Sequence, residues 1–183
     1  MNRVTRVPEL GFSAAVAPNP ETSLVMPSVL VVIDMQPGYP ASQDAVTQWF
    51  VKQEILRQSE RNLPVLLVEF DAHEMGETFE SIRCLVESYE HGHIIDKRSS
   101  NGSAEILSAC RRLQLPSEAF RICGVNSDAC VLETVQGLLS AHSTCLITLP
   151  QDACNCLTGK SNSIWQYFQS LARVTVELHV QMH

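Results

Sequence analysis

Short apolar runs alternate with amphipathic segments along most of the chain. Val29–Ile33 is a continuous run of large aliphatic residues that ends at Asp34. Such a run is typical of a strand that is buried on both faces, as in a parallel sheet. A turn containing Pro37 and Gly38 follows, and residues 43–62 then place apolar side chains at helical spacing. This order of strand, turn and helix predicts one βα unit.

The same alternation continues to the carboxyl end of the chain. Further strands are predicted at residues 65–70, 93–96, 119–123, 144–149 and 174–180, and further helices at residues 78–88, 104–113, 129–142 and 161–171. Alternating strands and helices favour right-handed βαβ units. We therefore predict an α/β fold of three layers (α/β/α) around a mostly parallel, doubly wound sheet. Residues 27–183 are predicted to form this domain, preceded by an N-terminal extension over residues 1–26.

Length, net charge and apolar runs indicate which kinds of partner the chain can bind. The chain has 183 residues, which is enough for one domain with a sizeable core. Its formal net charge of −7 and its lack of a basic run oppose binding to polyanions. No apolar run approaches the roughly 20 residues that span a bilayer. We therefore expect a small-molecule substrate, with neither nucleic acid nor membrane as a partner.

The seven cysteines do not form the pattern of a secreted disulfide framework. Their number is odd and their spacing irregular. No Cys-x-x-Cys pair exists, which gives a structural zinc site little support. These features predict a reducing compartment, and hence a cytoplasmic location.

Three residues with catalytic chemistry follow predicted strands. Asp34 ends the first strand, Lys97 ends the third, and Cys130 lies just after the turn that follows the fourth. Active sites in open parallel sheets lie beyond the carboxyl ends of the strands, so these side chains are expected to converge. A cysteine in the first turn of a helix, near a lysine, is predicted to have a lowered thiol pKa. An aspartate beside it can take and return the thiol proton, and first-turn amides can bind an oxyanion.

Each of these residues also has an ordinary structural interpretation. Cys130 can be a packed core thiol, Asp34 a turn cap, and Lys97 a solvated loop cation. Asp128 is predicted to be the N-cap of the helix that carries Cys130. Spacing alone leaves an enzyme and a non-catalytic domain equally open.

The motifs around these residues resemble those of the isochorismatase-like cysteine hydrolases, a family of nicotinamidases, carbamoyl-amide hydrolases and isochorismatases. The resemblance covers about residues 28 to 180. It rests on the following segments: Val29-Leu30-Val31-Val32-Ile33-Asp34-Met35-Gln36, the later Lys97, Gly124-Val125-Asn126-Ser127-Asp128-Ala129-Cys130-Val131 with Thr134, and Gln151-Asp152-Ala153-Cys154.

The resemblance implies a catalytic triad of Asp34, Lys97 and Cys130. It also implies a cis peptide bond between Val125 and Asn126, which would direct the Asn126 amide into an oxyanion hole together with that of Cys130. Tyr39 stands where the family often has a pocket-lining aromatic ring, although a surface turn residue would explain it equally well. Homo-oligomers are usual in the family, so a homo-oligomer is expected.

The segments that select substrate and metal depart from the family pattern. The segment after Lys97 is small and polar, and its Arg98 fits either a carboxylate-binding residue or a surface charge. Asp71 and His73 match the spacing of a nicotinamidase metal pair, but no third ligand can be placed, so these two remain weak candidates and no cofactor is expected.

These features together predict a hydrolase that cleaves a small amide or related C–N bond through a covalent thioester-type intermediate. Two alternatives stay open: isochorismatase-type vinyl ether hydrolysis led by Asp34, and a non-catalytic binding or assembly module. The substrate cannot be carried over from the resemblance.

Overall fold

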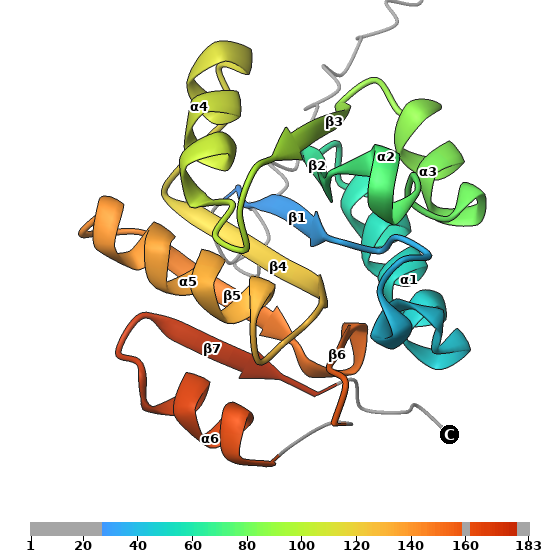
Figure 1. The fold of residues 1–183 in the computed structure, drawn as a ribbon. Coiled ribbons are helices and arrows are strands. Elements are labelled where there is room, and N and C mark those ends of the chain that lie inside the picture. The colour runs from blue at the N-terminus through green and yellow to red at the C-terminus, as the bar shows by residue number, and fades with distance from the viewer. Residues whose placement is uncertain (1–26, 159–161, 179–183) are drawn as a thin grey trace, which may run out of the picture.

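The computed structural model describes residues 27–158 and 162–178, and within them a parallel sheet forms the centre of the molecule (Figure 1). Its strands are β1 (Val29–Ile33), β2 (Val65–Phe70), β3 (Gly92–Lys97), β4 (Ala119–Val125), β5 (Leu146–Pro150), β6 (Cys154–Asn155) and β7 (Val174–Glu177). The strand order is β3-β2-β1-β4-β5-β7, with the short β6 paired to β4, and every pairing is parallel.

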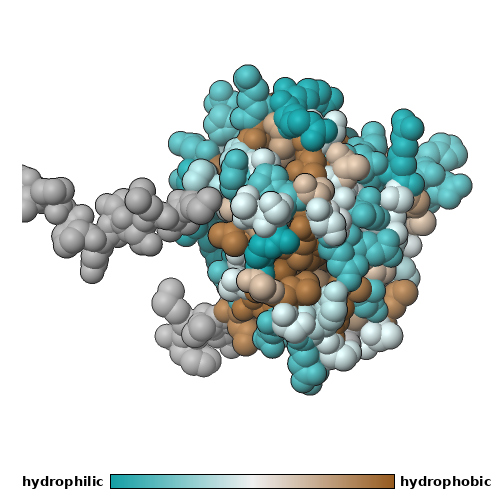
Figure 2. All heavy atoms as spheres, turned by 90° about the vertical axis from the view of Figure 1, so that its left-hand side faces the viewer, coloured by the Kyte–Doolittle hydropathy of each residue, from teal (hydrophilic) through white to brown (hydrophobic). Residues whose placement is uncertain are grey.

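Helices cover both faces of this sheet. The α-helices are α1 (Ala45–Glu60), α2 (Ala72–Met75), α3 (Glu80–Glu87), α4 (Ser103–Leu113), α5 (Cys130–Ala141) and α6 (Asn162–Ser170). Figure 1 shows α1 to α3 on one side and α4, α5 and α6 on the other. Figure 2 views the side of α4 and α5, where hydrophilic residues surround a central band of hydrophobic ones. The three-layer α/β/α architecture predicted from the sequence is confirmed.

The structure adds several short elements that the sequence pattern did not predict. They are the 3-10 helices η1 (Pro40–Gln43) and η2 (Gln151–Ala153), the four-residue α2 and the two-residue β6. None of them is long enough to show a period of its own. The predicted N-terminal extension and the last residues of the predicted final strand lie outside the described residues. Among residues 27–158 and 162–178, no helix combines the length and the apolarity that crossing a bilayer requires.

The central strands bring the site residues to one edge of the sheet. Every residue of β1 is buried, as expected between two helical layers. Gly124 at the end of β4 has φ +113°, and a Cβ atom there would lie 2.1 Å from the Ile33 carbonyl oxygen. Only glycine therefore allows β4 to approach β1 this closely. Asp34, immediately after β1, has φ 52°, a left-handed conformation that aspartate tolerates better than most residues.

Candidate functional site

A buried ion pair joins Asp34 to Lys97. The Lys97 Nζ atom lies 2.9 Å from Asp34 Oδ2, and both side chains are 0% exposed. Because β2 lies between β1 and β3, the long lysine side chain spans the end of β2, with Nζ 5.1 Å from the centre of the Phe70 ring. Removing two charges from water costs free energy, which only a well-oriented ion pair recovers. Buried charged groups of this kind are frequent in functional sites.

The loop after β3 holds the lysine and ties it to α5. Lys97 Nζ donates hydrogen bonds to the carbonyl oxygens of Ser99 and Ser100, at 3.0 and 3.4 Å. The amide of Gly102 donates to Thr134 Oγ1 at 3.0 Å. Since Thr134 lies on α5, the helix that begins at Cys130 also fixes the loop that orients Lys97. Thr134 was part of the sequence motif, but its role as a link was not predicted.

Gln36 fastens the end of β1 to the end of β2. Its Nε2 donates to the carbonyl oxygens of Phe70 and Gly76, and its Oε1 accepts from the Phe70 amide at 2.8 Å. The residue is fully buried. The Gln36 side chain therefore holds the segment between Asp34 and Tyr39 against the end of β2. The sequence marked Gln36 only as part of a motif and gave no signal for this positioning role.

Cys130 is the first residue of α5, and its thiol is more basic than the sequence predicted. Burial and the negative charge of Asp34 raise the thiol pKa to about 11, while Lys97 lowers it only in part. The prediction of a lowered pKa is therefore wrong for the resting site. The main reason is burial of the sulfur, and the second is that Asp34, which is paired with Lys97, offsets the effect of the lysine charge on the thiol. At neutral pH the thiol is protonated and needs a base.

Asp34 is placed to be that base. Burial raises its carboxyl pKa, and the charge of Lys97 together with interactions from the Cys130 thiol and the Tyr39 hydroxyl counteracts part of the rise. Burial and the nearby charges of Asp34 and Cys130 also raise the Tyr39 pKa well above its usual value, so this phenol stays protonated. Tyr39 thus serves as a partner of Asp34 rather than only as an aromatic wall.

Replacing Tyr39 with phenylalanine is expected to shift the acid limb of activity to higher pH. The hydroxyl lowers the Asp34 pKa, so its removal raises that pKa, and the ionised base is then populated only at higher pH. The test is the pH dependence of kcat/KM for the wild type and Tyr39→Phe. An unchanged acid limb would show that the hydroxyl does not act on Asp34.

The peptide bond between Val125 and Asn126 is cis, as the family resemblance implied. The Asn126 carbonyl oxygen accepts from the amides of Ala129 and Val131 at 3.1 and 3.0 Å, which closes the turn into α5. Within the described residues, the amides of Asn126 and Cys130 have no backbone acceptor. Two free amides beside a nucleophile are the chemistry of an oxyanion hole.

The predicted N-cap of this helix is wrong. Ala129 occupies the N-cap position without any side-chain cap, and Asp128 is exposed. The turn that carries the cis bond shifts the helix start by one residue from the expected position. Cys130 thereby becomes the first helical residue, where the helix amides remain unpaired.

A cavity of about 430 Å³ opens beside Lys97. Its lining residues are Phe70, Asp71, Ala72, Asp96, Lys97 and Arg98. The volume suits a small organic molecule. Two cationic side chains line this cavity, Lys97 and Arg98. Lys97 is paired with Asp34, whereas Arg98 has no carboxylate partner among the described residues. The sequence left its role open between a carboxylate-binding residue and a surface charge, and the structure places it at the edge of this cavity.

Asp71 lines this cavity and His73 does not, and neither residue belongs to a buried cluster. Asp71 is the N-cap of α2 and accepts a hydrogen bond from the Glu74 amide, and both Asp71 and His73 are exposed. Among the residues described, no three His, Cys, Asp or Glu side chains gather as a metal ion would require. Asp71 therefore has a structural role in helix capping that needs no metal.

Comparison with solved structures identifies proteins of the same fold. The nicotinamidase of Staphylococcus aureus matches with a TM-score of 0.71 and 18% identity, covering 84% of this chain and 98% of that one. N-carbamoylsarcosine amidase of Thermoplasma acidophilum gives 0.65 and 18%, covering 84% and 96%. An isochorismatase of Pseudomonas putida gives 0.64 and 18%, covering 83% and 88%. No family model and no curated protein matches the sequence. These similarities establish the fold.

Proposed function

We propose that this protein is an isochorismatase-like cysteine hydrolase that cleaves a small amide or related C–N bond. The observation that carries the proposal is the buried Asp34–Lys97 pair, which faces the thiol of Cys130 at the start of α5. Amidases and nicotinamidases among the proteins of the same fold support the reaction class. Asp34, Lys97 and Cys130 act in it as a catalytic triad.

The acylation half of the reaction begins with a proton transfer, because the resting thiol of Cys130 keeps its proton. Asp34 takes the proton of the Cys130 thiol, and the sulfur attacks the carbonyl carbon of the substrate. The carbonyl electrons move to oxygen, where the amides of Asn126 and Cys130 stabilise the oxyanion. Asp34 then gives its proton to the leaving nitrogen, the C–N bond breaks, and a thioester with ammonia or an amine results. Throughout, Lys97 keeps the carboxylate oriented and balances its charge.

Deacylation uses the same groups in reverse. Asp34 takes a proton from water, the hydroxide oxygen attacks the thioester carbon, and the thiolate leaves. The proton on Asp34 returns to the sulfur of Cys130, and the carboxylic acid departs. In total one water and one amide give one acid and one amine. A single buried carboxylate therefore serves as base and acid in both halves, and the pKa that burial raises suits it to both roles.

The test is ammonia release from a panel of primary amides and N-carbamoyl compounds. Cys130→Ala is expected to lower turnover by on the order of a thousandfold or more, because covalent catalysis requires the sulfur. Cys84→Ala is the matched control, since that thiol is exposed and belongs to α3. Denaturing mass spectrometry of the wild type during turnover is expected to show an acyl group on Cys130.

Other outcomes point to the two competing functions. Turnover of a vinyl ether that survives Cys130→Ala but is lost in Asp34→Asn would establish acid chemistry led by Asp34. An isochorismatase of this fold makes that the second candidate. If the protein turned over neither the amides nor the vinyl ether, and if the Cys130 thiol could not be alkylated even at high pH, it would be a binding module.

The proposal includes a cytoplasmic location and a small-molecule substrate. All seven cysteines lie in the part of the chain that the structure describes and none of them is in a disulfide bond there, which supports a reducing, cytoplasmic location. The substrate is a small molecule, as the cavity beside Lys97 suggests. No resident cofactor takes part in the steps above, and a homo-oligomer is expected.

A further inference from the structure

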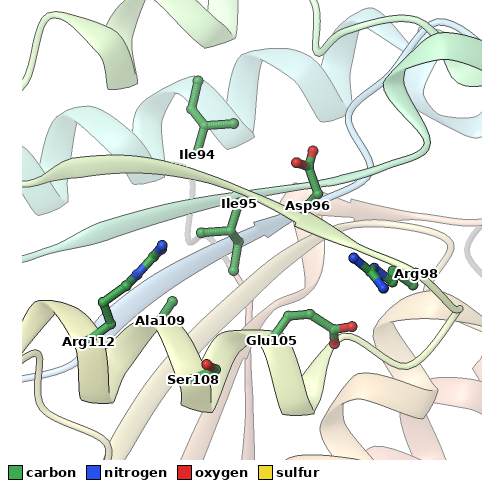
Figure 3. A pocket seen from close by; sticks show the side chains of 8 residues that line it. All are labelled: Ile94, Ile95, Asp96, Arg98, Glu105, Ser108, Ala109 and Arg112. Atoms are coloured by element: carbon green, nitrogen blue, oxygen red, sulfur yellow. The ribbon is translucent and has the colours of Figure 1, made fainter.

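A groove with unpaired charges runs along β3 at the edge of the sheet (Figure 3). It has a volume of about 590 Å³, and its lining residues are Ile94, Ile95, Asp96, Arg98, Glu105, Ser108, Ala109 and Arg112. The first four come from β3 and the loop after it, and the others from α4. Figure 3 shows Arg98 and Glu105 at one end and Arg112 at the other.

The main chain of β3 offers hydrogen-bonding groups toward this groove. Val65 donates to the carbonyl oxygen of His91, and Val65 is level with Gly92 in the parallel register. In a parallel ladder alternate residues bond the neighbouring strand, so the odd-numbered residues of β3 face β2. The peptide groups of Ile94 and Asp96 therefore face outward. β3 is the terminal strand in the described sheet, and a bare edge of this kind is a template for another strand.

The charged side chains of the groove lack partners within their own chain. The side chains of Asp96, Arg98, Glu105 and Arg112 make no hydrogen bond or ion pair with any residue that the structure describes. One carboxylate oxygen of Glu105, Oε2, is buried as well as unpartnered. Burying a carboxylate oxygen without a donor is unfavourable, so this oxygen indicates a surface that is complete only when something covers it.

We propose that a second copy of this chain covers the groove, with the two β3 strands pairing antiparallel about a two-fold axis at Ile94. Outward-facing residues that lie opposite each other exchange both of their hydrogen bonds in an antiparallel pair. Ile94 then faces Ile94 of the other copy, and Asp96 lies opposite Gly92, whose amide already donates to the Tyr89 carbonyl oxygen. The strand pairing is therefore short and centred on Ile94.

The helices beneath the strands are complementary about the same axis. α4 packs along β3, with Glu105 toward the Arg98 end of the groove and Arg112 at the other end. Burial lowers the pKa of His93 in β3, and the nearby charges of His91 and Arg112 lower it further. The midpoint of Glu105 and Arg112 falls at Ser108 and Ala109, two small residues in the middle of the groove. A two-fold axis there places Glu105 of each copy opposite Arg112 of the other, so the dimer contains two such charge pairs. The buried, unpartnered oxygen thereby gains a guanidinium donor.

The alternative register is less complementary. An axis at Ile95 sets Ile94 opposite Asp96, which leaves an aliphatic side chain beside a carboxylate. The register centred on Ile94 joins the apolar residues instead. It also gives the dimer a link to the catalytic region, because Arg98 lines both the groove and the cavity beside Lys97.

The experiment is a charge exchange followed by sedimentation equilibrium of the full chain. Glu105→Arg and Arg112→Glu each set like charges against each other and are expected to raise the dimer dissociation constant at least roughly tenfold. The double variant E105R/R112E restores opposite charges and is expected to return the constant to within about threefold of the wild type. Arg111→Glu is the matched control, since Arg111 is exposed, adjacent in sequence and outside the groove.

A second variant tests the strand pairing without touching the bonds to β2. Ile94→Glu places two like charges at the two-fold axis and is expected to give monomers whose circular dichroism matches that of the wild type. The proposal is overturned if the wild-type chain is monomeric, if neither charge reversal weakens the dimer, or if the exchanged pair remains as weak as the single variants. None of these readouts depends on catalytic activity, so the result is separate from that for the proposed hydrolase.

Discussion

Asp34→Asn is expected to abolish turnover while making the Cys130 thiol react faster with iodoacetamide at neutral pH. The two effects have opposite signs because Asp34 has two influences on the sulfur. In the mechanism that we propose, it is the base that removes the thiol proton. As a negative charge it opposes formation of the thiolate in the resting protein, and it is a principal cause, after burial, of a thiol pKa of about 11.

The size of both effects follows from these roles. Loss of a general base lowers kcat/KM by about two to four orders of magnitude. With an asparagine at position 34 the Lys97 charge is no longer neutralised, and it then lowers the pKa of the Cys130 thiol. Each unit by which that pKa falls toward neutrality increases the thiolate fraction about tenfold.

The measurement is the rate of alkylation at pH 7, read by peptide mass mapping. The exposed thiol of Cys84 supplies an internal reference in the same digest, because its surroundings do not include Asp34. Cys130 in the wild type is expected to react more slowly than Cys84 at pH 7 and to gain reactivity as the pH approaches 11. If Asp34→Asn instead slowed alkylation, the thiol would depend on the carboxylate for activation at rest, and the assignment of a protonated resting thiol would be wrong.

The fold and the convergence of Asp34, Lys97 and Cys130 followed from local patterns. Buried aliphatic runs such as Val29–Ile33 leave little alternative to a doubly covered parallel sheet, and residues at the carboxyl ends of its strands then share one edge. The ion pair between Asp34 and Lys97 is a consequence of strand order, with β2 between β1 and β3.

The energetics of the site depend on three-dimensional arrangement and were not predictable in the same way. The sequence indicated a helix terminus and a lysine near Cys130, both of which favour a thiolate. It did not show how deeply the Cys130 thiol is buried, nor that the negative charge of Asp34 offsets the effect of Lys97 on the sulfur. Burial and the Asp34 charge together raise the thiol pKa where the sequence predicted that it would fall. The clamp made by Gln36 escaped prediction for a similar reason, because its acceptors belong to segments 34 and 40 residues away.

Lys97→Met is expected to destabilise the protein by about 3–5 kcal/mol at neutral pH, since it leaves the Asp34 carboxylate buried without its counter-charge. The loss is expected to depend on pH. Burial already raises the Asp34 pKa, and Lys97 is the largest influence that lowers it, so the variant has a still higher pKa in the folded state. A carboxyl whose folded pKa exceeds its unfolded value favours folding below the unfolded pKa, and this contribution is lost as the pH rises through the folded pKa.

The difference in unfolding free energy between the wild type and Lys97→Met is therefore expected to be small in acid and to grow as the pH rises toward neutrality. Urea unfolding at pH 5 and pH 8 measures it directly. The double variant D34N/K97M carries a neutral amide in place of the buried charge and is expected to recover a substantial part of the loss at pH 8 while staying inactive. A deficit that is equal at both pH values, and unaffected by the second substitution, would mean that Lys97 stabilises the fold through its packing on Phe70 rather than through its charge.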